Sequence, residues 1–426
     1  MQTPTQEELI EALPGITPAV VSIIHKYMGY PFIMTVYDKQ FVLQLYAKNP
    51  EPNFDEDSPL IIEWGDGTST VIDRNNENHP NADVSDGIIY IRHDYKSYGA
   101  HQISIYNASG ICFKGTPFPM TISQWGKYKI TNGHEMFADC GDITFNTRDS
   151  PIILTTCFAR MFRNSTIRGE LNWDTININN MRAMFLRCKL YCYILTLNTQ
   201  NVTDMSHMFS ECELKDISWN ISEWNTSSCS NMHRMFYGFT RFNDDLSQWD
   251  TSKVTNMCAM FYGCNIYNGD LSKWSVNNVT DMHSMFYYCC QFNGALSRWE
   301  TGNVIDMGLM FMGCRNFNGD LKYWNVGKVR NMNYMFWGCD SFNSDLSRWD
   351  VESVINMGYM FSRCKIMNID VTKWDVHNVK DMSSMFEYCQ CFNRDLNNWR
   401  LGPNTDTINM VLGCDSLTII PSWVKK

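Results

Sequence analysis

A 25-residue repeat is the feature that most restricts what this chain can fold into. Residues 278–299 read NVTDMHSMFYYCCQFNGALSRW, and the copies 25 residues before and after keep Met, Phe, Asn and Trp in place. A period of this length is typical of a solenoid, in which each repeat buries its apolar face against its neighbours. With Met-Phe as the marker, about twelve copies begin at Met136, Met161, Met184, Met208, Met235, Met260, Met285, Met310, Met335, Met360, Met385 and, in a degenerate form, Met410.

The spacing of apolar residues within one copy predicts a helix. Positions i, i+3, i+4 and i+7, which share one helix face, are apolar in the central copies, for example Met257, Met260, Phe261 and Cys264. The following stretch, Tyr267–Trp274, has turn residues that lead into a short extended segment. We therefore predict an α/β solenoid of about 12 turns, leucine-rich-repeat-like. Strands stack about 4.8 Å apart and helices about 10 Å, so we expect a curved array with strands on its concave side.

Two other segments precede the repeats. Residues 30–115 contain β-rich runs such as LIIEWGDGTSTVI separated by turn residues, and they predict a small all-β, antiparallel sandwich. Residues 1–29 predict a helical segment in which Thr5 and Glu8 can form a capping box. Residues 116–426 then form the solenoid with its terminal caps.

Charge and hydropathy exclude several classes of protein. The net charge is −10, and no dense Lys/Arg cluster offers the basic face that a general nucleic-acid binder needs. No run approaches the roughly 18 apolar residues of a transmembrane segment. The N-terminal residues carry acids where a signal peptide carries basic residues, so a cytoplasmic or virion-associated location is favoured over secretion.

The repeat also carries a family resemblance. Over about residues 122–424 the copies follow the form W-N-x-S-x-V-T-D-M-x-x-M-F-x-x-C-x-x-F-N-x-D-L-x-x. This form resembles the BspA-like, leucine-rich-repeat-related family also named for Mycoplasma lipoproteins. Residues 30–113 look like a PKD-like sandwich, on the strength of WGDGT at residues 64–68 and HDY at residues 93–95. The resemblance implies a binding or surface-recognition protein rather than an enzyme. Such arrays also occur in protists and in large viruses that infect them.

Three repeat positions predict structural roles. Cysteine is interpreted as a small apolar filler, because a column offers one metal ligand per coil and helix-borne sulfurs would lie too far apart for disulfides. Asparagine is interpreted as a buried amide ladder that satisfies loop backbone groups. Tryptophan is interpreted as core rather than as a sugar-stacking platform. The central members are Cys264, Cys289, Cys314 and Cys339; Asn268, Asn293 and Asn318; and Trp274, Trp299 and Trp324.

An aspartate column leaves three explanations open. Stacked carboxylates repel one another, so calcium, a basic residue three places on, or a bond to a turn amide has to offset the charge. The sequence shows no nucleophile elbow, phosphate loop or paired zinc motif, and we predict no catalytic residue, cofactor or metal site. The members of this column are Asp245, Asp270, Asp320, Asp345, Asp370 and Asp395.

A neighbouring column changes its chemistry from copy to copy, as a binding surface does. We place it in the predicted strand, on the concave side, and predict a non-enzymatic scaffold that binds a protein partner there, such as a host protein. One alternative is an intracellular F-box-like adaptor, with Leu13–Met28 docking a ubiquitin-ligase subunit and the repeats holding its substrate. Another is a glycan-binding or glycan-acting protein. The column consists of Gln248, Lys273, Arg298, Tyr323, Arg348, Lys373 and Asn398.

Overall fold

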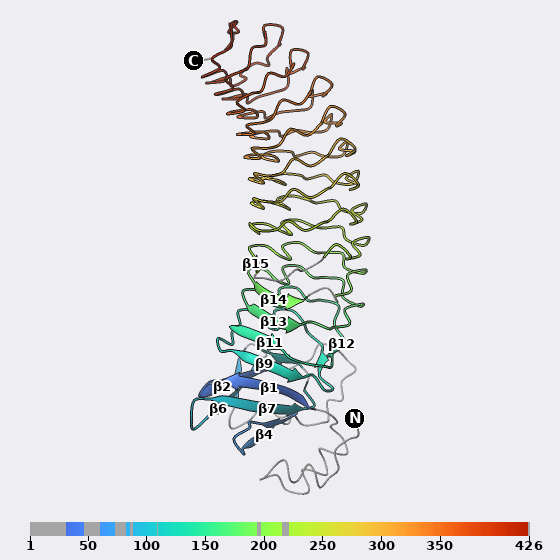
Figure 1. Cartoon of the computed structure of the whole chain (residues 1–426), viewed down its shortest axis with the longest axis vertical. Helices are drawn as coiled ribbons and strands as arrows, with labels where there is room; N and C mark the ends of the chain where they lie inside the picture. Colours follow the sequence, from blue (N-terminus) through green and yellow to red (C-terminus); the bar gives the residue numbers. More distant parts are fainter. Residues whose placement is uncertain are drawn as a thin grey trace. The chain divides into compact units, whose positions relative to one another are not determined.

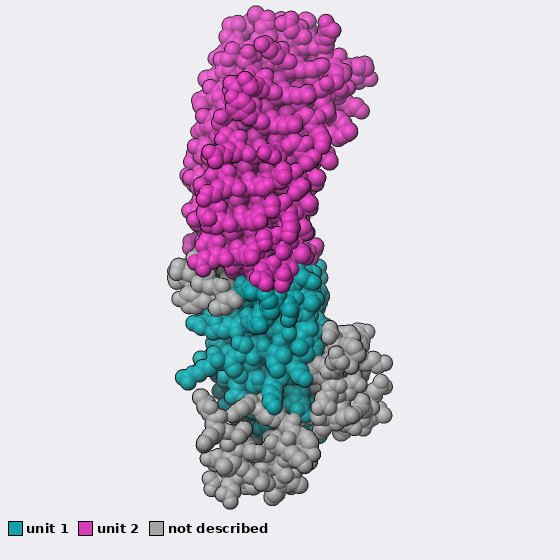
Figure 2. Space-filling model, turned by 90° about the vertical axis from the view of Figure 1, so that its right-hand side faces the viewer, with its two compact units in different colours: residues 1–180, 184–198, 214–219 teal, residues 181–183, 199–213, 220–426 magenta. Residues whose placement is uncertain are grey.

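The computed structural model describes residues 31–46, 60–72, 82–85, 88–108, 110–193, 197–214 and 221–424. The predicted helical segment at residues 1–29, including the F-box-like stretch, lies outside these residues. The chain divides into two compact units, coloured separately in Figure 2. Unit 1 comprises residues 1–180, 184–198 and 214–219, and unit 2 comprises residues 181–183, 199–213 and 220–426.

The described part of unit 1 begins with antiparallel strands arranged in two sheets. In the first sheet, β1 alternates buried Phe32, Met34 and Val36 with more exposed residues, the period of a strand with one face in the core. It pairs with β7, β7 pairs with β3, and β3 pairs with β4. The bounds are β1 Phe32–Tyr37, β3 Leu60–Glu63, β4 Ser69–Ile72 and β7 Ala100–Tyr106. The second sheet has the order β5 Ala82–Ser85, β6 Ile88–Asp94, β2 Gln40–Tyr46 and β8 Ile111–Cys112.

The first sheet continues into the repeats, as the row of arrows in Figure 1 shows. β1 pairs antiparallel with β9, and from there β9, β11, β13 and β14 pair in parallel, one coil after another. Regular strands therefore build about four coils. The predicted boundary between residues 115 and 116 lies in the connection from β8 of the second sheet to β9 of the first, and it stays a prediction. The bounds are β9 Met120–Gln124, β10 Lys129–Ile130, β11 Asp142–Phe145, β12 Ile152–Ile153, β13 Thr166–Glu170, β14 Lys189–Tyr193 and β15 Glu213–Leu214.

The predicted leucine-rich-repeat-like α/β solenoid of about 12 turns is wrong, because the residues described contain no helix and their regular elements are all β. Where a helix was predicted, three overlapping β-turns follow one another: Met260 N–H donates to Met257, Tyr262 to Ala259, and Cys264 to Phe261, at 3.0–3.2 Å. Ala259 and Gly263 have φ values of 53° and 73°, which an α-helix does not contain. After β15 Figure 1 accordingly shows plain coils.

The spacing between coils explains why no helix forms. Most of the other N–H groups of this segment leave the coil: Met257, Ala259 and Phe261 donate to carbonyls 24 residues later, at 2.8–3.1 Å. The rings of Phe261 and Phe286 are 5.5 Å apart, whereas helices need 8–10 Å between axes. A stack at this spacing excludes helices, so the predicted arrangement with helices on a convex side is also wrong. In unit 2 single parallel bridges, such as Asn256 to Asp281, replace regular strands.

The apolar pattern nevertheless marks the interior. All four members of the supposed helix face, Met257, Met260, Phe261 and Cys264, are 0% exposed. Three linked turns therefore present the same four positions to the core as a helix would. The pattern was correct about burial and wrong about the backbone that produces it.

Removing one ring from this interior should destabilise the stack. Phe286 lies 5.5 Å from Phe261, 5.5 Å from Phe311 and 4.1 Å from Phe292. We expect Phe286→Ala to lower the free energy of unfolding by about 3–5 kcal/mol, because it leaves a cavity between coils. Urea unfolding followed by circular dichroism measures this. The exposed Arg298→Ala should change stability by less than about 0.5 kcal/mol. Equal effects of the two variants would contradict this role for the ring stack.

A buried acid lies at the end of β3. Glu63 is 8% exposed, and Oε1 has no hydrogen-bond partner among the described residues. Burial raises the pKa of the Glu63 carboxyl from 4.5 to about 7, against the opposing effect of a hydrogen bond with Tyr106. The folded protein thus holds this proton more tightly than the unfolded chain. Its contribution to stability is full below pH 4.5 and is lost as the pH rises through 7.

Substituting this acid tests the assignment. Glu63→Gln keeps the shape and removes the titration, so the stability lost between pH 4 and pH 8 should shrink by up to about 3 kcal/mol. Unfolding midpoints measured across that pH range report the difference. The same substitution at the exposed Glu300 is the control and should leave the curve unchanged. Parallel pH curves for Glu63→Gln and the unsubstituted protein would show that Glu63 is not buried as described.

Candidate binding surface

The asparagine column forms a continuous ladder. Oδ1 of Asn268 accepts the backbone N–H of Asn293 at 2.8 Å, and Oδ1 of Asn293 accepts that of Asn318 at 2.9 Å. The side chains of these three residues are exposed, not buried as predicted. Each amide satisfies a loop N–H of the next coil and so ties neighbouring coils together.

The tryptophan and cysteine columns lie inside the coils. Trp274, Trp299 and Trp324 are 2–3% exposed, and each indole N–H donates to a backbone carbonyl 28 residues earlier, at 2.9–3.0 Å. The thiols of the column are free and donate to carbonyls in the same way, Cys289 to Phe261 at 2.9 Å. Burial raises the pKa of the Cys289 thiol well above its ordinary value. The four central column cysteines, Cys264, Cys289, Cys314 and Cys339, are 0% exposed.

Thiol reactivity should separate this column from Cys391, which is exposed. A thiolate must form and be reached by the reagent before it reacts, and burial opposes both steps for the column. We expect Cys391→Ser to remove one rapidly reacting equivalent when the folded protein is titrated with Ellman's reagent. Cys289→Ser should leave the rapid phase unchanged. Loss of rapid reaction in the Cys289→Ser variant would place that thiol at the surface.

The aspartate column forms turns with its own backbone. Oδ1 of Asp270 accepts the N–H of Ser272 at 2.9 Å, an Asx turn, and this bond lowers the pKa of the Asp270 carboxyl. Asp345 adds an ion pair with Lys322 at 2.7 Å. Bonds to turn amides are thus present, as one of the three explanations required. Across the described residues, no three or more His, Cys, Asp or Glu side chains group in a way that could hold a metal ion.

The variable column is exposed throughout, but it does not lie in a strand. Each member precedes a column tryptophan and occupies a β-turn, such as the one closed by Trp299 N–H donating to the Leu296 carbonyl at 3.1 Å. Its members can contact one another across coils, since the Arg348 guanidinium lies 5.1 Å from the centre of the Tyr323 ring. The exposed members are Gln248, Lys273, Arg298, Tyr323, Arg348, Lys373 and Asn398.

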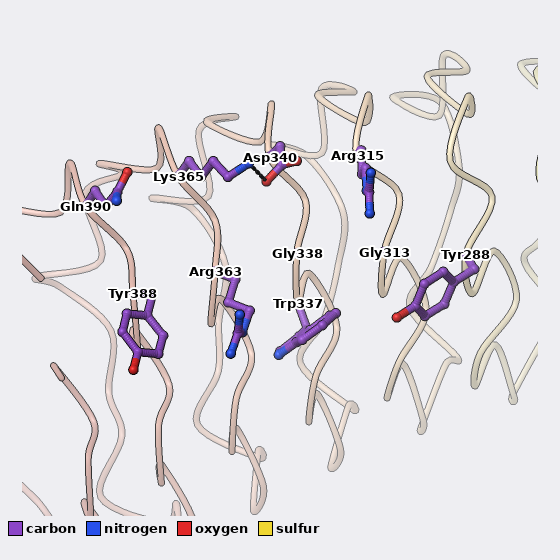
Figure 3. A pocket seen from close by; sticks show the side chains of 10 residues that line it. All are labelled: Tyr288, Gly313, Arg315, Trp337, Gly338, Asp340, Arg363, Lys365, Tyr388 and Gln390. Carbon is purple, nitrogen blue, oxygen red and sulfur yellow. Dashed lines mark ion pairs between the residues drawn. The ribbon is translucent and has the colours of Figure 1, made fainter. Parts of the chain in front are cut away.

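A second surface feature of unit 2 was not predicted. A hollow of about 470 Å³ lies across successive coils and contains no member of the variable column. Figure 3 shows its side chains in two rows, one of aromatic and arginine side chains and one of charged and amide side chains. The lining residues are Tyr288, Gly313, Arg315, Trp337, Gly338, Asp340, Arg363, Lys365, Tyr388 and Gln390.

Two consecutive glycines in one repeat column open this hollow. Tyr288, Gly313, Gly338, Arg363 and Tyr388 follow one another at 25-residue spacing. The Tyr288 ring covers Gly313, where an added Cβ would lie 3.1 Å from the ring. At Gly338 an added Cβ would meet nothing within 4 Å, so the floor is open there. In the sequence, two glycines in successive repeats, with large side chains at the same position before and after them, mark the hollow, whereas the predicted binding column lies elsewhere in the repeat.

The charges in the hollow are mostly positive. The Arg363 guanidinium lies 5.2 Å from the Tyr388 ring centre and 5.6 Å from that of Trp337, a cation–π arrangement. Lys365 pairs with Asp340 at 3.1 Å. In the part of the chain that the structure describes, neither Arg315 nor Arg363 forms an ion pair. Two arginines therefore remain uncompensated in a chain whose net charge is −10.

Comparison with known proteins assigns the repeats to a family. A family model described as "Mycoplasma protein of unknown function, DUF285" matches residues 154–265, 213–324 and 306–423, which together span more than half of the chain. No curated protein and no solved structure matches. The described residues include no helix long and apolar enough to cross a membrane. The predicted Mycoplasma-type, BspA-like repeat is confirmed, whereas the leucine-rich-repeat relation conflicts with the all-β fold. The chain belongs to the DUF285 family of Mycoplasma proteins of unknown function.

Proposed function

We propose that this protein is a non-enzymatic recognition scaffold that binds a protein partner through exposed side chains of its repeats. The observation that carries the proposal is that each coil has some positions that build the stack and others that face solvent and vary. The constant letters Met, Phe, Cys and Trp are buried, and Asn ties coils together, while the exposed column from Gln248 to Asn398 changes from coil to coil. A regular stack that presents different side chains at fixed intervals suits recognition through many modest contacts.

Burial of the tryptophan column favours a protein partner over a glycan. A sugar-stacking platform needs aromatic faces open to solvent, and Trp274, Trp299 and Trp324 are 2–3% exposed.

The F-box-like adaptor remains the other candidate, and its docking segment lies outside the described residues. A pull-down with and without residues 1–29 distinguishes it, because an adaptor loses ligase subunits on truncation while a scaffold keeps its partner.

We also propose that residues 30–115 are a PKD-like sandwich. The two stretches on which the resemblance rests are in contact. The Trp64 and His93 rings stack with centres 4.5 Å apart, and His93 Nε2 lies 3.0 Å from Asp66 Oδ2. Hydrogen bonds from Thr68 and His93 lower the pKa of the Asp66 carboxyl to about 2, although burial opposes them. These contacts support a structural use of both motifs.

Charge reversal in the variable column tests the scaffold. Arg298→Glu combined with Arg348→Glu should weaken binding of the partner at least tenfold, since it places repulsive charge at two positions of the contact face. The partner is first recovered by crosslinking in native extract and then measured with purified proteins by surface plasmon resonance. Lys253→Glu, exposed but outside the column, should change affinity less than twofold. Binding that tolerates the double variant, or a recovered ligand that is a glycan, would contradict the proposal.

A further inference from the structure

We propose that the hollow over Gly313 and Gly338 binds an extended acidic segment of a protein partner. The inference rests on the proposed function, which it deepens by naming the chemistry of one contact site. The hollow is separate from the variable column, and all of its residues belong to unit 2.

The positive charges select a carboxylate ligand. The Arg363 guanidinium is held between the Tyr388 and Trp337 rings at 5.2 and 5.6 Å, so its orientation is set before a ligand arrives. Its planar edge can donate two parallel hydrogen bonds to one carboxylate. Arg315, exposed in the other row, offers a second such group. The Lys365–Asp340 ion pair lies in the same row as Arg315 and involves neither arginine (Figure 3).

The floor and length of the hollow suit an extended chain. Gly338 has no atom within 4 Å of an added Cβ, so a peptide backbone can approach the floor closely. Half-buried Tyr288 and Trp337 flank it. Ring centres between Phe286 and Phe386 are 5.5–5.7 Å apart over four steps, about 22 Å in all. An extended peptide of about six or seven residues has this length.

Aromatic geometry favours a peptide over an anionic glycan. Sugars bind proteins largely by stacking a ring on an open aromatic face. Here the Arg363 guanidinium lies against both Trp337 and Tyr388, and the Tyr288 ring lies against Gly313. What the hollow offers instead is guanidinium edges above a glycine floor, which matches carboxylates spaced along an extended backbone.

Fluorescence anisotropy with the full chain tests the inference. The probes are three fluorescein-labelled heptapeptides in which Leu alternates with Glu, Gln or Lys. We expect the Glu peptide to bind at least tenfold more tightly than the Gln peptide, with an affinity that falls as salt rises. Arg315→Glu with Arg363→Glu should lower that affinity at least tenfold. Lys253→Glu with Lys328→Glu changes net charge equally, at exposed positions outside both the hollow and the variable column, and should alter it less than twofold.

Several results would overturn the inference. Equal binding of the Glu and Gln peptides would do so, as would an equal loss in the two double variants. Tighter binding of a heparin-derived hexasaccharide would reassign the hollow to a sulfated glycan. Circular dichroism of both double variants confirms that they fold. If the Glu peptide fails while the partner still depends on Arg298 and Arg348, the proposed function stands and this inference alone is wrong.

Discussion

The distance between coils is the constraint on which the rest of the structure depends. From Phe261 to Phe386 the ring centres of the Phe column repeat every 5.5–5.7 Å, close to the spacing of paired strands and far below the 8–10 Å that packed helices need. Every element of a coil has to repeat at that interval. Turns and single bridges can do so because half of their N–H groups point along the stack to the next coil. In an α-helix the backbone N–H groups bond within the helix itself, and packed helices are wider than the interval between coils.

The same interval explains why the repeat keeps the same residue types at certain positions. A coil without regular strands leaves many backbone groups in need of partners, and side chains supply them. Asn Oδ1 accepts an N–H of the next coil, Trp Nε1 donates to a carbonyl of the previous one, and the Cys thiol does the same from the interior. Each of these groups serves two coils at once. Replacing one of these residues therefore affects both of the coils that its side chain joins, so few substitutions are tolerated at these positions.

Surface positions escape this constraint, and both candidate binding surfaces arise there. The variable column lies at exposed turn corners where any side chain fits. The hollow arises where two glycines replace the large side chains found above and below them in the same column. The fold thus keeps the backbone regular while allowing local changes in shape and charge. Recognition can then vary without any rearrangement of the interior.

The sequence by itself determined the period, the buried face and the family. Repetition of Met257, Met260, Phe261 and Cys264 marked the residues that lie inside, because burial follows apolar pattern whatever the backbone does. Only the tertiary structure decided the backbone type. The spacing i, i+3, i+4, i+7 fits a helix and three linked turns alike, and the choice depends on hydrogen bonds to a coil 24 residues away. The hollow likewise required the structure, since Tyr288, Trp337 and Arg363 lie in one site only because successive coils stack in register.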